Sequence, residues 1–116
     1  YGAVFSNFLT QKKKKRPLTI VGNGKQTRDF IHVDDLTNAF IKLARSNLKN
    51  KIYNLGSGKE TSINKIADII GGKKIFIPKR PGDPNRSCAN ISKIKKDIKW
   101  KPRISIIEGI DRLFQS

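Results

Sequence analysis

Short apolar runs alternate along this chain with longer stretches whose apolar residues recur every three or four positions. The short runs, rich in β-branched and aromatic residues, predict strands at 18–21, 29–33, 51–55 and 75–77. The longer stretches predict helices at about 1–15, 35–45, 62–70, 92–98 and 106–114. Because strands and helices alternate, the expected fold class is α/β or α+β, in one domain over residues 1–116.

Caps and apolar stripes define these helices more closely. Asp34 or Asp35 is expected to cap the second helix, and Thr61 or Ser62 the third. A capping box at 105–108 opens the last helix. The side chains expected to be buried lie at helical spacing: Val4, Phe5, Phe8 and Leu9; Leu36, Ala39, Phe40 and Leu43; Ile63, Ile66, Ala67 and Ile70; and Ile107, Ile110, Leu113 and Phe114.

Length and composition exclude several classes of protein. A chain of 116 residues can bury a core, and no run of about 18 apolar residues predicts a transmembrane helix. Cys88 stands alone, which excludes an internal disulfide, and with His32 as the only histidine no zinc site is expected. We expect that Tyr1 is not a natural start, and nothing before Phe5 resembles a signal peptide.

The charge of the chain is strongly positive. Lysine and arginine number 25 against nine acidic residues, a formal net charge of +16, which is typical of nucleic-acid-binding proteins. However, Lys, Ile and Asn are abundant together and share AT-rich codons, so a compositional bias would also produce this charge. The dense cluster at 12–16 contains no aromatic residue for base stacking, and the helix macrodipole favours basic residues at a helix end. Nucleic-acid binding is therefore the alternative and not the leading hypothesis.

Two glycine-containing motifs invite a nucleotide-binding interpretation. The segment 56–61, Gly-Ser-Gly-Lys-Glu-Thr, has Thr61 where a dinucleotide fingerprint needs its third glycine. A phosphate-binding P-loop needs Ser or Thr after Gly58-Lys59, and this chain has Glu60. The segment therefore predicts a tight turn between a strand and a helix.

A self-contained active site is not evident. The single His32 lies between apolar residues and is expected to be a hydrogen-bonded packing residue. Asp34 and Asp35 are adjacent, so they do not oppose each other across a substrate. No tyrosine is followed by lysine four residues later.

Two arginines stand in unusual places in a chain that otherwise uses lysine. Arg28 follows a turn, and Arg80 lies in an Arg-Pro-Gly-Asp loop. The planar guanidinium can hold phosphate oxygens in a bidentate way, which lysine cannot do. The alternative is a local ion pair, Arg28 with Asp29 and Arg80 with Asp83.

Motifs along nearly the whole chain resemble those of one family. Segment 22–35 is similar to the G-D-G-x-Q-T-R-D-F-x-x-V-x-D signature of the NAD-dependent nucleotide-sugar epimerase/dehydratase family, the extended short-chain dehydrogenases/reductases. Segment 52–58 resembles its Y-N-x-G-x-G, and 80–83 its R-x-G-D. The ending, from Ile91 to Gly109, fits as well.

The resemblance implies the carboxyl-terminal substrate-binding part of such an enzyme, a small mixed α/β subdomain. The Rossmann domain, which binds most of the NAD and carries the catalytic Tyr-x-x-x-Lys pair, would lie outside this chain. In this family a hydride passes from a sugar carbon to NAD. The implied partners are a UDP-sugar, the enzyme's own Rossmann domain and a second subunit, with no membrane. The implied setting is cytoplasmic carbohydrate metabolism, including the synthesis of cell-surface polysaccharides.

Within this family the chain is most similar to the UDP-glucose 4-epimerases, which are isomerases. Dehydratases and decarboxylases of the same family are the alternative. The resemblance implies a set of substrate-binding residues and no catalytic residue. Arg28 and Arg80 would clamp the diphosphate, and Asp83 would accept hydrogen bonds from the ribose. The remaining contacts would be Thr19 and Val21 at the base edge, Val4 and Ile63 near the nucleoside, and Phe30 near the site.

Overall fold

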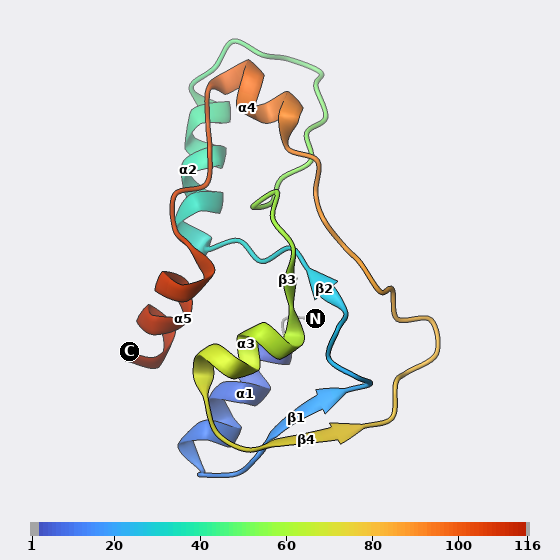
Figure 1. Cartoon of the computed structure of the whole chain (residues 1–116). Helices are drawn as coiled ribbons and strands as arrows, with labels where there is room; N and C mark the ends of the chain where they lie inside the picture. Colours follow the sequence, from blue (N-terminus) through green and yellow to red (C-terminus); the bar gives the residue numbers. More distant parts are fainter. Residues whose placement is uncertain (1–2, 116) are drawn as a thin grey trace.

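A computed structural model describes residues 3–115 and forms five helices and four short strands within them (Figure 1). Their order is α1 (Ala3–Lys13), β1 (Leu18–Val21), β2 (Thr27–Arg28), α2 (Val33–Ala44), β3 (Thr61–Ser62), α3 (Ile63–Ile70), β4 (Lys74–Ile77), α4 (Ser92–Ile98) and α5 (Ile106–Gln115). The α/β class and the five helices expected from the sequence are confirmed. The expected start of the first helix at Tyr1 lies outside the described residues.

The strands form two separate pairs. β1 and β4 run parallel, with Leu18 opposite Lys74, and they lie side by side at the lower end in Figure 1. β2 and β3 are antiparallel, with Thr27 opposite Ser62. Parallel strands need a long crossover connection, and here 52 residues of chain separate Val21 from Lys74, including α2 and α3.

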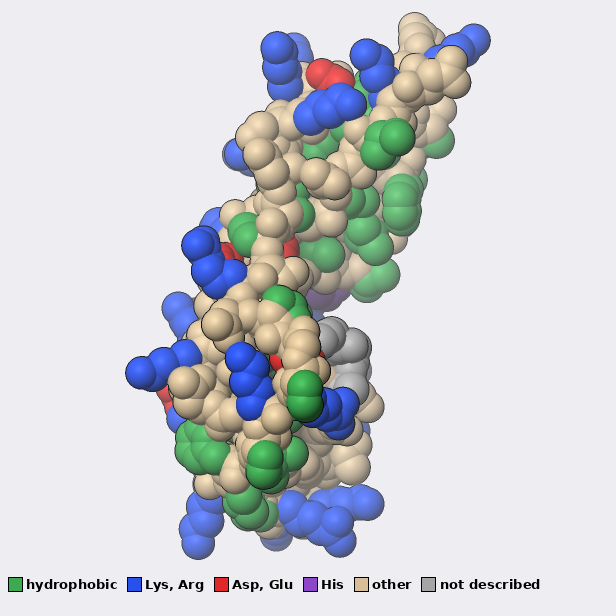
Figure 2. Space-filling model, turned by 90° about the vertical axis from the view of Figure 1, so that its right-hand side faces the viewer, with side chains coloured by type: hydrophobic (Ala, Val, Ile, Leu, Met, Phe, Trp, Pro, Cys, Tyr) green, Lys and Arg blue, Asp and Glu red, His purple; other side chains and the backbone are tan. Residues whose placement is uncertain are grey.

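The molecule is elongated because its buried residues form two clusters and not one. Its principal extents are 49 × 33 × 16 Å and its Cα radius of gyration is 16.1 Å. A compact domain of this length would have a radius of gyration of about 13 Å. Figure 2 shows the long face, on which basic side chains project from one end to the other.

The larger cluster, here the lower cluster, joins α1, β1, α3 and α5. Each element contributes one apolar face, as the helical spacing predicted for α1 and α3. Its buried members are Phe8, Leu18, Ile20, Ile63, Ile66, Ala67 and Ile110.

The smaller cluster, here the upper cluster, contains Ala39, Ile91, Ile94 and Trp100. The indole Nε1 of Trp100 donates to the backbone oxygen of Asp35 at 3.2 Å. The buried Asp35 carboxylate accepts from the backbone nitrogens of residues 103 and 104 at 3.0 and 2.9 Å. One aspartate of α2 therefore fixes the chain between α4 and α5.

The N-cap of α2 differs from the expected one. His32 caps the helix, because its Nδ1 accepts a hydrogen bond from Asp34 N at 3.0 Å. Neither Asp34 nor Asp35 is the cap. Both lie in the first turn of the helix, where the positive end of the helix dipole stabilises their negative charge. The cap of α3 is Ser62, one of the two expected residues, since its Oγ accepts from Lys65 N at 3.0 Å.

Two expected strands are not formed. The strand expected at 29–33 is absent: pairing is confined to Thr27 and Arg28 just before it, residues 29–32 pair with no strand, and Val33 begins α2. Residues 51–55 have strand composition but no partner strand among residues 3–115, and Ile52 is 86% exposed. A strand forms only where a neighbouring strand pairs with its backbone N–H and C=O groups. Residue composition alone therefore did not predict these two strands correctly.

Two side chains expected in the core are exposed. Phe40 on α2 and Ile107 on α5 are each 58% exposed. On α2 the buried positions are Asp35 and Ala39, so the side bearing Phe40 and Ile41 is open. On α5 the buried position is Ile110, with Ile106 half-buried one turn before it.

None of the helices within residues 3–115 has the length and apolar character to span a membrane.

Candidate functional site

A cavity of about 160 Å³ opens beside β1, between α1, α3 and the loop that follows β4. We call it the β1 cavity. Asn7, Phe8 and Gln26 form part of its lining. The rest of the lining consists of six of the eight predicted site residues: Val4, Thr19, Val21, Ile63, Arg80 and Asp83. Residues predicted to bind one ligand thus come together from four separate segments of the chain.

The free edge of β1 forms a wall of this cavity. Leu18 N and Gly22 N donate to backbone oxygens on the β4 side, at 2.8 and 2.7 Å. Because backbone groups alternate in direction along a strand, Thr19 and Val21 direct theirs to the opposite edge. No strand covers that edge within residues 3–115.

Two glutamine side chains reach this edge. Gln11 of α1 accepts from Thr19 N at 3.0 Å and donates to Thr19 Oγ1 at 2.9 Å. Gln26 donates from Nε2 to Val21 O at 2.8 Å. The other two groups of this edge are Thr19 O and Val21 N–H. Neither forms a hydrogen bond with a side chain or with loop backbone within residues 3–115. The sequence analysis missed both glutamines: Gln26 is the Q of the signature at 22–35 but was given no role there, and Gln11 stood in no motif.

The turn between β1 and β2 is fixed by α3. Gly24 has a φ of +73°, as its glycine permits. Asn64 donates from Nδ2 to Asn23 O at 2.9 Å, and its backbone N donates to Gly24 O at the same distance. A Cβ at Gly24 would lie 2.1 Å from Asn64 Oδ1, so only glycine lets α3 approach this closely.

The loop of residues 78–90, which carries Arg80 and Asp83, is anchored at its far half. Arg86 donates from Nε and Nη2 to the two carboxylate oxygens of Glu60, each at 2.7 Å. Two parallel hydrogen bonds of this kind are the strong form of an arginine–carboxylate pair. In addition, Thr27 N donates to Asn85 O at 2.9 Å. The loop is therefore tied to β2 and to the chain just before β3.

The carboxyl group of Glu60 is more acidic than an ordinary glutamate. Hydrogen bonds from Arg86 and Thr27 lower the pKa of Glu60 from 4.5 to about 2. Thr27 Oγ1 donates to Glu60 Oε1 at 2.9 Å. The anchor of the loop is therefore ionic at any pH above about 4.

The two predicted arginines have different environments. Arg80 is exposed, and its side chain forms no ion pair within residues 3–115, so the local pair with Asp83 is not formed. Asp83 N donates instead to Arg80 O, at 3.4 Å. Arg28 is only 6% exposed; it donates from Nη1 to Thr27 O at 2.7 Å and does not line the β1 cavity.

Asp29 has a structural role that sequence reasoning did not find. Its Oδ1 accepts from Ser57 N and Oγ at 2.7 and 2.5 Å. Its Oδ2 accepts from Gly58 N at 3.0 Å and from Ala89 N at 3.1 Å. Asp29 therefore binds three segments together, and it does not pair with Arg28 among the described residues. Its place in the R-D-F motif was the available signal.

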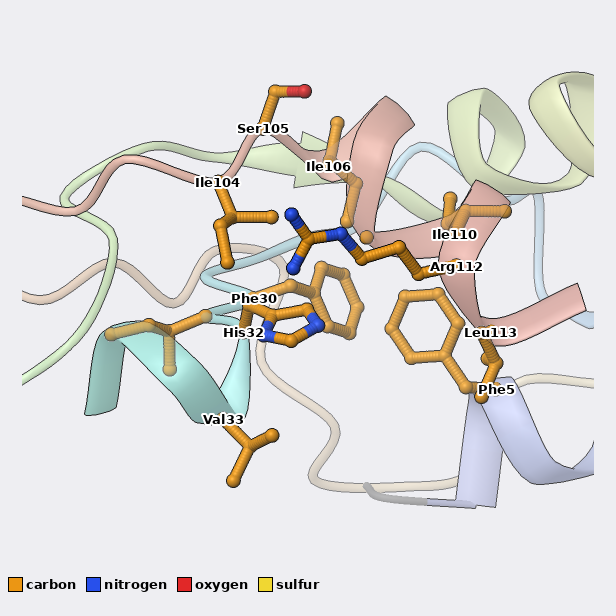
Figure 3. A pocket seen from close by; sticks show the side chains of 12 residues that line it. Phe5, Phe30, His32, Val33, Ile104, Ser105, Ile106, Ile110, Arg112 and Leu113 are labelled. Carbon is orange, nitrogen blue, oxygen red and sulfur yellow. The ribbon is translucent and has the colours of Figure 1, made fainter. Parts of the chain in front are cut away.

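Phe30 lies at a second, larger cavity of about 380 Å³, beside α5. Its ring meets that of Phe5 edge to face, with centroids 4.9 Å apart. Figure 3 shows Arg112 from α5 extending over the side of the cavity that holds His32 and Phe30. Arg112 donates to Glu108 at 2.8 Å. The lining is otherwise mostly aliphatic, and the structure does not bring Phe30 to the β1 cavity.

The Gly56–Gly58 turn does not fit a dinucleotide pyrophosphate. Such a site needs free backbone N–H groups at the turn. Here the N–H groups of Ser57 and Gly58 are already donated to Asp29. Within residues 3–115 no group of three His, Cys, Asp or Glu side chains could hold a metal ion.

Residues 1–56 match the family model described as the NAD dependent epimerase/dehydratase family. The chain is 40% identical over 116 residues to a putative UDP-glucose 4-epimerase of Methanocaldococcus jannaschii, covering 95% of this chain and 37% of the relative. It is 34% identical over 120 residues to UDP-glucuronic acid decarboxylase 1 of Arabidopsis thaliana, covering 97% of this chain and 27% of the relative.

The fold is similar to a solved structure of UDP-glucuronic acid 4-epimerase from Bacillus cereus, in complex with UDP-glucuronic acid and NAD. The TM-score is 0.89 at 27% sequence identity, over 97% of this chain and 38% of that one. The chain thus spans between about a quarter and two fifths of the length of the proteins that it matches.

Proposed function

Since the chain belongs to the NAD-dependent epimerase/dehydratase family, we propose that it forms the nucleotide-holding part of an enzyme that converts UDP-sugars. One observation carries this proposal: six residues implied to bind nucleotide-sugar line the single β1 cavity. Thr19 and Val21 face the base, Val4 and Ile63 pack near the nucleoside, and Asp83 accepts hydrogen bonds from the ribose hydroxyls.

Arg80 would neutralise the diphosphate. It lies on an anchored loop and lines the β1 cavity, and its guanidinium forms no ion pair within the described residues. A diphosphate is recognised best by such a fork. Arg28 is the proposed second arm; it is buried, donates to Thr27 O and does not line the β1 cavity.

The reaction proposed is that of a UDP-glucose 4-epimerase, an NAD-dependent isomerase. A relative of 40% identity carries the name of a putative UDP-glucose 4-epimerase, which supports this choice. The alternative is a nucleotide-sugar decarboxylase or dehydratase, supported by the relative of 34% identity. The β1 cavity would serve either reaction, because it would hold the nucleotide and not the sugar.

NAD would be held mainly by residues outside this chain, in an amino-terminal Rossmann domain. The Gly56–Gly58 turn, which is the described segment closest to a dinucleotide fingerprint, uses its N–H groups for Asp29. The open side of α2 with Val33, Phe40 and Ile41 would contact that domain. We further propose a homodimer for the full-length enzyme, working in the cytoplasm on sugars for cell-surface polysaccharides.

The binding of UDP by Arg80→Ala tests the proposal. The loss of hydrogen bonds to a charged group costs roughly 1.5–3 kcal/mol, so UDP should bind about 10- to 150-fold more weakly in calorimetric titration. Arg45→Ala is the matched control, because Arg45 is the exposed residue that ends α2. Equal UDP affinity in the two variants would show that Arg80 does not bind the diphosphate.

Salt dependence separates this function from nucleic-acid binding. Affinity for a polyanion falls steeply with salt, because many condensed counterions are released on binding. A diphosphate held by one or two arginines should lose much less affinity between 50 and 200 mM salt. Tight single-stranded DNA binding with a steep salt slope, together with no measurable UDP binding, would favour the basic nucleic-acid module.

A further inference from the structure

The β1 edge presents four backbone groups in sequence: Thr19 N–H, Thr19 C=O, Val21 N–H and Val21 C=O. The outer two are occupied, Thr19 N–H by Gln11 Oε1 at 3.0 Å and Val21 C=O by Gln26 Nε2 at 2.8 Å. The inner two, an acceptor followed by a donor, form no hydrogen bond with the side chains or loop backbone of residues 3–115. They belong to residues that line the β1 cavity.

We propose that Gln11 and Gln26 are positioning residues that set the register of the nucleobase on β1, a role that rests on the nucleotide-binding function proposed above. The glutamines leave one place for a planar ring that carries an N–H beside a carbonyl oxygen. The ring N–H donates to Thr19 C=O, and the ring carbonyl accepts from Val21 N–H. The imide edge of uracil has this arrangement.

Without the glutamines, the edge would offer competing places. A ring could bind Thr19 through both its N–H and its C=O, or Val21 in the same way. Each alternative would shift the base by about one residue along β1, roughly 3.3 Å. Such a shift would move the attached ribose and diphosphate away from Asp83 and Arg80, which lie on the same cavity.

Both glutamines are held in place by more than one contact. Gln11 makes two hydrogen bonds to Thr19, one to the backbone and one to Oγ1. Gln26 is fixed through its backbone as well, since its carbonyl accepts from Ile63 N at 3.1 Å. Because these side chains are already ordered, the ligand does not have to order them on binding.

The two glutamines use different ends of the amide, which gives a test with opposite expected results. At Gln11 the backbone contact is an acceptor, so Gln11→Glu keeps it, and a second carboxylate oxygen can accept from the Thr19 hydroxyl. At Gln26 the contact is a donor, so Gln26→Glu would place an acceptor against the Val21 carbonyl. The same substitution should therefore preserve one contact and break the other.

The experiment compares the affinities of the whole protein for UDP and for inorganic pyrophosphate, which has no base. The ratio of these affinities cancels the effect of the added charge on the phosphates. In Gln26→Glu the ratio should fall about tenfold, because a base in the shifted register costs the ribose about one hydrogen bond to Asp83. In Gln11→Glu it should stay within about twofold of the unaltered protein. Gln26→Met should also lower it, without adding charge.

Gln115→Glu is the matched control, because Gln115 bonds Asp111 within α5, away from β1. A ratio that is unchanged in Gln26→Glu, while Arg80→Ala weakens UDP binding, would overturn the role of the glutamines and leave the proposed function intact. Failure of the unaltered protein to bind UDP would overturn both. Thermal unfolding of each variant shows whether the fold is retained.

Discussion

Replacement of Asp29 by alanine should destabilise the protein strongly. Its carboxylate accepts four hydrogen bonds, from Ser57 N, Ser57 Oγ, Gly58 N and Ala89 N. In Asp29→Ala, three backbone N–H groups lose their acceptor. The serine hydroxyl keeps one, because Ser57 Oγ also lies 3.2 Å from Lys59 O.

The expected magnitude follows from those three donors. A hydrogen bond to a charged group contributes about 1.5–3 kcal/mol, and the site is half-buried, so water will replace part of each bond. We therefore expect the free energy of unfolding to fall by about 3–5 kcal/mol. The total for a chain of this length is roughly 6–17 kcal/mol. Asp29→Asn should lie between, because it keeps one acceptor oxygen.

Urea unfolding followed by tryptophan fluorescence measures this change. Trp100 is the only tryptophan and is 3% exposed in the upper cluster, so its emission reports unfolding directly. Asp111→Ala is the control, since Asp111 is exposed on α5 and accepts from Gln115 alone among the described side chains. If Asp29→Ala and Asp111→Ala changed stability equally, the hydrogen bonds of Asp29 would not hold the three segments together.

Two other substitutions test single contacts. Glu60, with its pKa lowered from 4.5 to about 2 by Arg86 and Thr27, stabilises the fold above pH 4.5 and loses this effect as the pH falls toward 2. Glu60→Gln should therefore show a smaller fall in melting temperature between pH 5 and pH 2.5, and an equal fall would contradict the assignment. Gly24→Ala should cost about 2–4 kcal/mol in urea unfolding, from its positive φ and its contact with Asn64. Gly82→Ala, with φ +84° and open space around it, should cost only about 1 kcal/mol, and equal losses would exclude the contact.

Helices were predictable here because their signals are local. The Ser62 cap, the apolar stripe of α3 and the positive-φ Gly71 that ends it can all be found within ten residues of one another. Strands were less predictable, because pairing depends on residues far away. Residues 51–55 have the composition of a strand, but within residues 3–115 no strand pairs with them, and Ile52 stays exposed.

The α2 cap shows a different limit of local signals. Aspartate is a strong capping residue, and two of them stand at the start of the helix. The chain uses His32 instead, and the Asp35 carboxylate accepts from the backbone nitrogens of residues 103 and 104. That long-range role of Asp35 has no signal in the neighbouring sequence.

The candidate site was predictable from motifs only in its outline. Six residues named from the resemblance line the β1 cavity, but Phe30 lies at the other cavity and Arg28 does not line either. Gln11 stands in no motif, and the signature that contains Gln26 gave it no role. Their roles follow from which backbone groups of β1 face away from β4, and this depends on the register of a strand 56 residues away.

The unpaired segment 51–55 also bears on the colloidal behaviour of the protein. A segment of strand composition that has no partner strand is a template for intermolecular pairing. Lys49 lies just before this segment and Lys51 begins it, and a net charge of +16 makes every molecule repel its copies. Salt shortens the range of that repulsion to about 10 Å at 0.1 M. The ions that weaken this repulsion therefore also promote self-association, and low ionic strength keeps the chain dispersed.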